Sequence, residues 1–84
     1  MSIIEFNSLG EFLKHERKKR NLTQSQFAEL LETTCTNYKM LETGKIPCGI
    51  VSLQRFGTIL RVSQKRLRSL DDKTRELLKK EGKW

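Results

Sequence analysis

Apolar residues recur along most of the chain at the three- and four-residue spacing of amphipathic helices, and short polar breaks separate the runs. The first run, residues 9–20, places Leu9, Phe12 and Leu13 on one helical face. Asn21 follows it and tolerates the left-handed backbone that ends many helices. Only one Pro and five Gly interrupt the chain. The pattern therefore predicts an all-α fold of five short helices, or six if the C-terminal segment forms one of its own.

The second helix is expected to begin at Thr23, because a hydroxyl there and Gln26 three residues later form a capping-box pattern. Its apolar residues are Phe27, Ala28, Leu30 and Leu31.

A third helix is expected to follow after only residues 32–34, so the chain must bend sharply between the two. Thr34 is its expected N-cap and Gly44 marks its end. Tyr38 and Leu41 are expected to point inward, with the Tyr38 hydroxyl at the rim of the core.

The remaining pattern predicts a loop at residues 45–49 that carries the thiol of Cys48, a fourth helix over residues 50–60, and a fifth helix capped by Ser63. The fourth helix is expected to bury Ile50, Leu53, Phe56 and Leu60. Residues 71–84 either extend the fifth helix, add a sixth, or form a solvated basic tail. A thin apolar stripe accompanies this region: Leu67, Leu70, Leu77, Leu78 and Trp84.

Length and charge bound the class of protein. Eighty-four residues suffice for one small domain, and we expect a core over residues 9–70 with a basic extension over 71–84. The chain carries 17 Lys and Arg against 10 Asp and Glu, a net charge of +7, and the excess is greatest in the C-terminal third. A charge of this size on a small domain favours an anionic partner, nucleic acid first.

Several other classes find no support in the sequence. No apolar run approaches the roughly 18 residues of a membrane span, and no signal-peptide pattern is present, so a cytoplasmic location without membrane contact is expected. Two cysteines do not make a disulfide framework. His15 has no second ligand at metal spacing, and no nucleophile has a plausible base, so we expect no metal, no cofactor and no catalytic residues.

The stretch LTQSQFAELLETTCTNYKMLETGK, residues 22–45, resembles the Cro/cI-type (Xre) helix-turn-helix family of phage and bacterial transcriptional repressors. The matching residues are Leu22, Thr23, Gln24, Phe27, Ala28, Leu31, Leu41, Glu42, Gly44 and Lys45. The segment SLQRFGTILRVSQKRL continues the similarity, which covers roughly residues 9–70. The resemblance implies a compact lambda-repressor-like DNA-binding domain with the helix-turn-helix at its second and third helices.

The resemblance also implies roles for individual residues. Those expected to read base edges from helix 34–43 are Thr34, Cys35, Thr36, Lys39 and Met40. Those expected to contact DNA phosphates are Thr23, Gln24, Asn37, Thr43 and Lys45. Arg17 and Glu42 occupy positions that often form an ion pair between the first and third helices. The reading helix has no Arg or Gln for bidentate base contacts, so we expect modest direct discrimination, biased toward thymine methyls and supplemented by DNA shape.

The chain departs from the family at two places where Gly is usual, Glu32 in the bend and Arg61 after the fourth helix. A non-Gly residue in the left-handed conformation costs about 1–2 kcal/mol. Either the second helix runs longer than usual, or this strain is tolerated.

The expected function is sequence-specific binding of double-stranded DNA as a small bacterial or phage transcriptional regulator, a repressor that binds a palindrome as a homodimer with half-sites about 34 Å apart. We expect no effector domain after the DNA-binding unit, so regulation would come through abundance, dimerisation or a protein partner such as an antirepressor. Two alternatives stay open. One is an antitoxin that binds DNA and a toxin protein, and the other is a protein-interaction module that keeps the fold without reading DNA.

Overall fold

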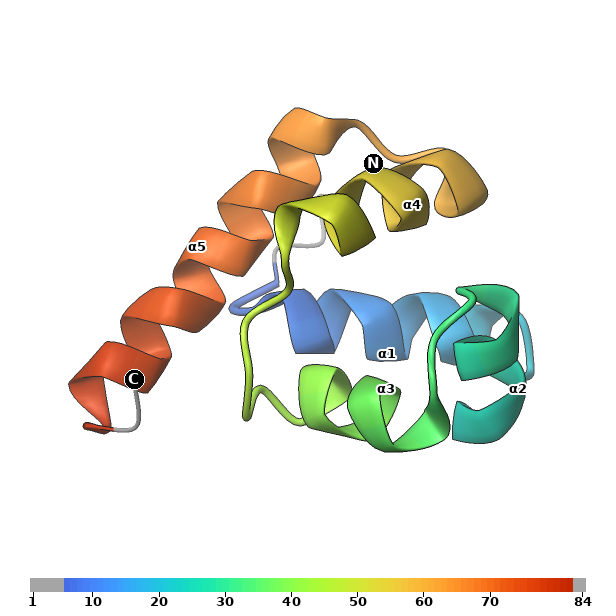
Figure 1. Cartoon of the computed structure of the whole chain (residues 1–84), viewed down its shortest axis with the longest axis horizontal. Coiled ribbons are helices and arrows are strands. Elements are labelled where there is room, and N and C mark those ends of the chain that lie inside the picture. The colour runs from blue at the N-terminus through green and yellow to red at the C-terminus, as the bar shows by residue number, and fades with distance from the viewer. Residues whose placement is uncertain (1–5, 83–84) are drawn as a thin grey trace.

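The computed structural model describes residues 6–82. This part of the chain contains five helices joined by loops: α1 (Leu9–Lys19), α2 (Gln24–Leu30), α3 (Cys35–Glu42), α4 (Ile50–Leu60) and α5 (Gln64–Lys80). No strand occurs between residues 6 and 82. α1 packs against α3 and α5, α2 packs against α3, and α4 packs against α5 (Figure 1). The predicted all-α fold is therefore confirmed. Within the same residues, no helix is both long and apolar enough to span a bilayer.

Hydroxyl side chains define where most of the helices begin. Ser8, Thr23, Thr34 and Ser63 each have an extended backbone and accept a hydrogen bond from the amide three residues later. Thr23 forms the full capping box, because its own N–H donates to Gln26 Oε1 over 2.9 Å. These bonds satisfy amides that the helix itself leaves unpaired. The predicted starts at Thr23, Thr34 and Ser63 are confirmed.

Left-handed residues end the helices. Asn21 (φ 56°), Gly44 (φ 73°) and Arg61 (φ 57°) follow α1, α3 and α4. After α3 the N–H of Lys45 donates to Met40 O over 2.9 Å, and that of Gly44 donates to Leu41 O over 3.2 Å. This is the Schellman pattern, in which the reversed backbone satisfies the last carbonyls of a helix. Arg61 therefore adopts the left-handed conformation directly after α4, at the position where Gly is usual.

The core combines residues from all five helices and the loop before α4. Its largest fully buried side chains include Phe12, Phe27, Phe56 and Tyr38, and the rings of Phe27 and Tyr38 meet edge to face with centroids 5.4 Å apart. The predicted position of the Tyr38 hydroxyl at the rim is wrong: the residue is fully buried, and its hydroxyl faces the Glu42 carboxylate inside the protein. Burial, and next the nearby Glu42 carboxylate, raises the pKa of Tyr38.

Two apolar residues that we expected in the core lie on the surface. Leu30 occupies the last position of α2 and is 42% exposed, whereas Phe27 and Ala28 on the same helix are buried. Ile50 is the first residue of α4 and is 55% exposed. Leu31, directly after Leu30, is fully buried, so Leu30 is exposed because its side chain points away from the core and not because the end of α2 lacks cover.

The C-terminal segment does not form a solvated tail. Residues 71–80 extend α5 without a break, so no sixth helix exists between residues 6 and 82. Asp71, Thr74 and Leu78 are buried, and the N–H of Leu9 donates to Thr74 Oγ1 over 3.0 Å. α5 therefore packs against the start of α1 beyond residue 70 (Figure 1). Trp84, part of the predicted apolar stripe, lies outside the described residues.

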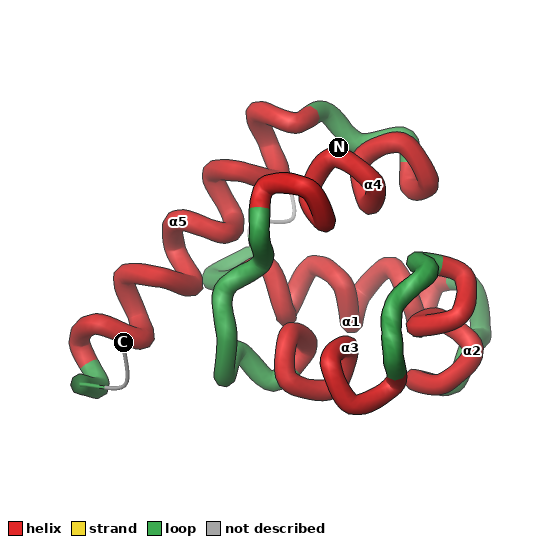
Figure 2. The backbone as a smooth tube through the Cα atoms, viewed as in Figure 1, coloured by secondary structure: helices red, strands yellow, loops and turns green. Residues whose placement is uncertain are grey.

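The long connection between α3 and α4 is held by α5 (Figure 2). The N–H of Cys48 donates to the buried carboxylate of Asp71 over 2.7 Å, and Arg75 donates both to Asp71 Oδ2 and to Cys48 O. Cys48 is 2% exposed, so the thiol that we placed in a loop is part of the core. Burial, and next the charge of Asp71, raises the pKa of Cys48 to about 12, which keeps the thiol protonated and unreactive near neutral pH.

Candidate nucleic-acid interface

The bend between α2 and α3 has the geometry of a tight helix-turn-helix. α2 ends at Leu30, Glu32 adopts φ 59°, and the N–H of Thr33 donates to Ala28 O over 2.9 Å. Glu32 therefore takes the left-handed position in which Gly is usual, and α2 does not run longer to avoid it. The strain is tolerated because the turn satisfies the terminal carbonyls of α2.

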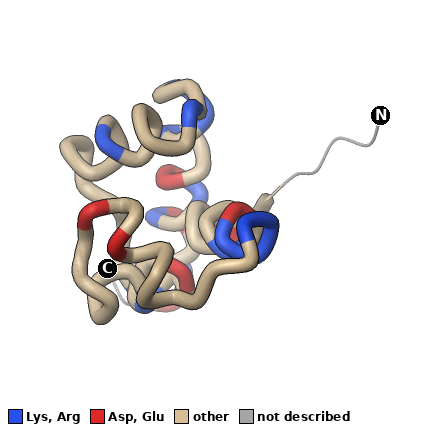
Figure 3. Tube along the Cα trace, turned by 90° about the vertical axis from the view of Figure 1, so that its right-hand side faces the viewer, with Lys and Arg blue, Asp and Glu red and all other residues tan. Residues whose placement is uncertain are grey.

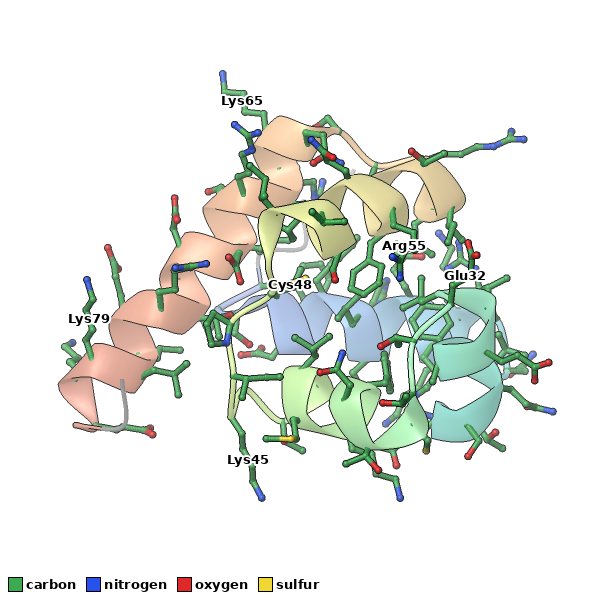
Figure 4. All side chains as sticks on the ribbon, viewed as in Figure 1. Glu32, Lys45, Cys48, Arg55, Lys65 and Lys79 are labelled. Atoms are coloured by element: carbon green, nitrogen blue, oxygen red, sulfur yellow. The ribbon has the colours of Figure 1, made fainter. Side chains whose placement is uncertain are left out.

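A clamp from α4 supports the bend. Arg55 Nη1 donates a hydrogen bond to the backbone carbonyl oxygen of Glu32 over 2.9 Å (Figure 4). This charged donor therefore satisfies a carbonyl in the turn. Asn37 contributes from the other side, because its Nδ2 donates to Thr33 Oγ1 over 2.9 Å. The sequence alone did not indicate Arg55, since nothing in its spacing connects it to residue 32.

The surface of α3 divides into a buried and an exposed side. Tyr38 and Leu41 are buried against the core, whereas the exposed residues repeat at the spacing of one helical face. These exposed residues are Thr36, Lys39, Met40 and Thr43. Most of the predicted reading residues thus share one exposed face.

The first turns of α2 and α3 meet beside this face. Cys35 Sγ lies 3.2 Å from Ser25 Oγ, and either atom could be the donor. Cys35 is only partly exposed, so it lies at the edge of the exposed face of α3 and not at its centre. Ser25 is exposed and was missed by the sequence reasoning, because a serine inside the first turn of a helix carries no distinctive pattern.

Arg17 and Glu42 join three elements behind α3. Arg17 Nε and Nη2 each donate to a Glu42 carboxylate oxygen over 3.0 Å, and Nη1 donates to Leu22 O over 3.0 Å. Gln24 Nε2 donates to the same carboxylate over 3.4 Å. Burial alone would raise the pKa of Glu42, but the hydrogen bonds and charge of Arg17 outweigh it and lower that pKa. The pair therefore fixes the end of α3 to α1 and to the start of α2.

The five predicted phosphate contacts differ in how free their donors are. Lys45 is exposed and extends from the side of α3 (Figure 4), and Thr23 uses its hydroxyl oxygen, not its proton, in the cap. Thr43 instead donates its hydroxyl proton to Lys39 O over 2.8 Å. One amide proton each of Asn37 and Gln24 is engaged inside the protein, which leaves a second proton on each amide.

Basic residues are not concentrated around α3. Figure 3 shows Lys and Arg on several elements, including the end of α1 and the junction of α4 with α5. Figure 4 shows Lys65 extending from the opposite side of the molecule to Lys45. A duplex that lay against α3 would therefore be out of reach of Lys65.

Replacing Glu32 by Gly is expected to raise the free energy of unfolding by about 1 kcal/mol, because relief of the left-handed strain exceeds the extra freedom of the unfolded chain. Urea unfolding would measure it as a higher midpoint at unchanged slope. Glu29→Gly is the matched control: Glu29 is an exposed glutamate inside α2, where Gly should cost about 1 kcal/mol. Equal effects of the two changes would contradict a strained turn.

A family profile described as a helix-turn-helix domain matches residues 8–70. This range contains both helices of the bend, the Arg17–Glu42 pair and the Arg55 clamp. Comparisons with curated proteins and with solved structures gave no match. The profile covers well over half of the chain, and its range includes α2, α3 and the bend between them. The chain belongs to the helix-turn-helix domain family.

Proposed function

We propose that the protein is a small transcriptional repressor of the Cro/cI type that binds double-stranded DNA with α3 in the major groove. The observation that carries this proposal is the exposed face of α3, which is held between a capped bend and a buried ion pair. The membership of the chain in the helix-turn-helix domain family supports it. A helix presented in this way beside the start of α2 matches the docking geometry of helix-turn-helix proteins.

Base contacts come from the start and centre of the exposed face. Thr36 offers a hydroxyl and a methyl group, Met40 offers apolar contact to thymine methyls, and Lys39 reaches a guanine edge or a phosphate. Thr34 and Cys35 contribute at the edge. Thr34 Oγ1 accepts the N–H of Asn37 and Cys35 Sγ shares a hydrogen bond with Ser25 Oγ, which limits how far each side chain can turn. Discrimination between bases is modest, because no side chain makes a bidentate contact.

Phosphate contacts come from both sides of the bend. Lys45 supplies a full charge after α3, and Thr23 and Gln24 flank the first turn of α2, where unpaired amides favour an anion. Asn37 and Thr43 add weaker contacts through the hydrogen-bonding capacity that their internal bonds leave. Two copies then bind a palindrome, each inserting one α3.

The test is selection of binding sites from a random duplex library, followed by gel shifts on an enriched site at two salt concentrations. Thr36→Ala combined with Met40→Ala is expected to weaken binding to the selected site by about 1–3 kcal/mol and to change base preference. Lys45→Ala is expected to weaken binding to all duplexes and to reduce the salt slope by about 1.

Two matched controls separate these roles from general effects. Thr58 is an exposed threonine on α4, and Lys65 lies on the opposite side of the molecule to Lys45. Thr58→Ala and Lys65→Ala should leave affinity and salt slope unchanged. If the library yields no preferred sequence and the α3 variants bind like the wild type, the domain does not read DNA and the protein-interaction alternative gains support.

A further inference from the structure

The most exposed large apolar side chains of residues 6–82 lie next to each other at the start of α4. Ile50 is 55% exposed and Val51 is 66% exposed, more than Leu77 on α5 or Leu30 on α2. The backbone here is ordered by its contacts, since Cys48 is tied to Asp71 and Gly49 O accepts the N–H of Leu53 over 2.9 Å. Two adjacent apolar side chains on a rigid helix start form a small fixed patch.

A hollow of about 250 Å³ adjoins this patch, between the start of α4 and the middle of α5. Its lining is mixed: Ile50 and the buried Cys48 and Leu53 are apolar, whereas Arg68, Asp71, Asp72 and Arg75 are charged. A valine or isoleucine side chain is smaller than the hollow, so an apolar side chain from another molecule can enter it. The chain thus presents both an apolar projection and a recess that accepts one.

The rim of the hollow carries charges of both signs. Arg68 and Asp72 are exposed on α5, four residues apart, and neither takes part in an ion pair among residues 6–82. Four residues of helix span about 6 Å. Two copies of α5 that cross antiparallel about a twofold axis would therefore place Arg68 of each copy opposite Asp72 of the other.

We propose that this surface, composed of Ile50, Val51, Arg68, Asp72 and the hollow between them, is the interface of a homodimer. A twofold contact requires a surface that complements itself. The proposed surface complements itself in shape, because Val51 of each copy faces the hollow of the other. It also complements itself in charge, because Arg68 of each copy pairs with Asp72 of the other. This proposal assigns a location to the interface of the homodimer in the proposed function. It rests on that function only for the expectation that a dimer forms.

The experiment measures self-association of the whole protein by sedimentation equilibrium, without DNA, from micromolar to millimolar concentration. The wild type is expected to form a dimer. Ile50→Ser combined with Val51→Ser should raise its dissociation constant on the order of 100-fold, because each lost apolar contact occurs twice. Leu30→Ser combined with Leu77→Ser, a matched change at the other exposed apolar positions, should leave the constant unchanged.

Charge reversal gives an independent measurement that does not alter the apolar patch. Arg68→Glu alone or Asp72→Arg alone should weaken the dimer by about 10-fold, and the two together should restore it, because the pairs re-form with opposite signs. A wild type that stays monomeric at all concentrations, or a dimer weakened by the Leu30 and Leu77 changes instead, would overturn the proposal. Because no DNA is present, either result would leave DNA binding by α3 to be judged separately.

Discussion

Replacing Gly10 by alanine is expected to lower the free energy of unfolding by about 3 kcal/mol, near the upper end for overpacking a protein interior. Gly10 is buried where α1 crosses the end of α3. A Cβ added there would lie 2.3 Å from Glu42 O and 2.5 Å from Leu41 O. Both atoms are backbone, so no rotation of a side chain can relieve the clash and the two helices must separate. The helix-propensity gain of about 1 kcal/mol for alanine is too small to offset this.

Thermal unfolding followed by circular dichroism would measure the loss as a fall in melting temperature of roughly 12–24 °C. Gly57→Ala is the matched control, since Gly57 is also buried in a helix. There the nearest atom, Gln64 Nε2 at 2.2 Å, belongs to a side chain, which can shift at the cost of its hydrogen bond to Leu53 O. The nearest backbone atom, Val62 O, is 3.0 Å away, so a smaller loss is expected. A Gly10→Ala protein that melts like the wild type would show that α1 and α3 are farther apart than the structure places them.

Replacing Glu42 by alanine is expected to cost about 3 kcal/mol, because removal of one partner leaves the Arg17 charge uncompensated in a largely buried position. The side chains of Arg17 and Glu42 are 15% and 5% exposed. Glu16→Ala is the matched control: Glu16 pairs with Arg20, the residue that caps the end of α1, and such a pair one helical turn apart contributes only about 0.3–0.5 kcal/mol. Equal midpoints for the two variants in urea unfolding would contradict a structural role for the Arg17–Glu42 pair.

The same pair predicts how stability depends on acidity. The pKa of Glu42 in the folded protein lies below its usual value of 4.5, so as pH falls the unfolded chain takes up the proton first. The stability from the ionised carboxylate is therefore fully present above about pH 4.5 and is lost as pH falls through the lower, folded-state pKa. Unfolding free energies measured in urea from pH 6 downward should fall less steeply for Glu42→Ala than for the wild type.

Local signals in the sequence predicted the helices well. Thr23, Thr34 and Ser63 each cap a helix through a hydrogen bond with the amide three residues later. Such a short-range capping pattern can be recognised in a single sequence. Ile50 was misplaced because helical periodicity gives the direction of a side chain without saying whether another element reaches it. The extent of α5 was left open for the same reason, since its burial depends on the start of α1, more than sixty residues away.

In the candidate interface, too, the features set by local sequence could be predicted, whereas those set by contacts between separate elements could not. The exposed face of α3 follows from its spacing, whereas Ser25, Arg55 and Gly10 matter through contacts with residues distant in sequence. Gly10 is the clearest example. In sequence it is a residue that weakens a helix, and only the crossing of α1 with α3 explains its place there.

The hydrogen bond from Leu9 N to Thr74 Oγ1 also bears on the order in which the domain can assemble during synthesis. α2 and α3 leave the ribosome early and can pair locally, but the first turn of α1 keeps an unpaired amide until residue 74 has emerged. At about 5–20 residues per second, the wait from the end of α3 is roughly 2–6 s. During that interval the apolar side of α1 that α5 later covers is open to water and to chaperones. The packing of α1, the first helix to be synthesised, is therefore completed only after the final third of the chain has been made.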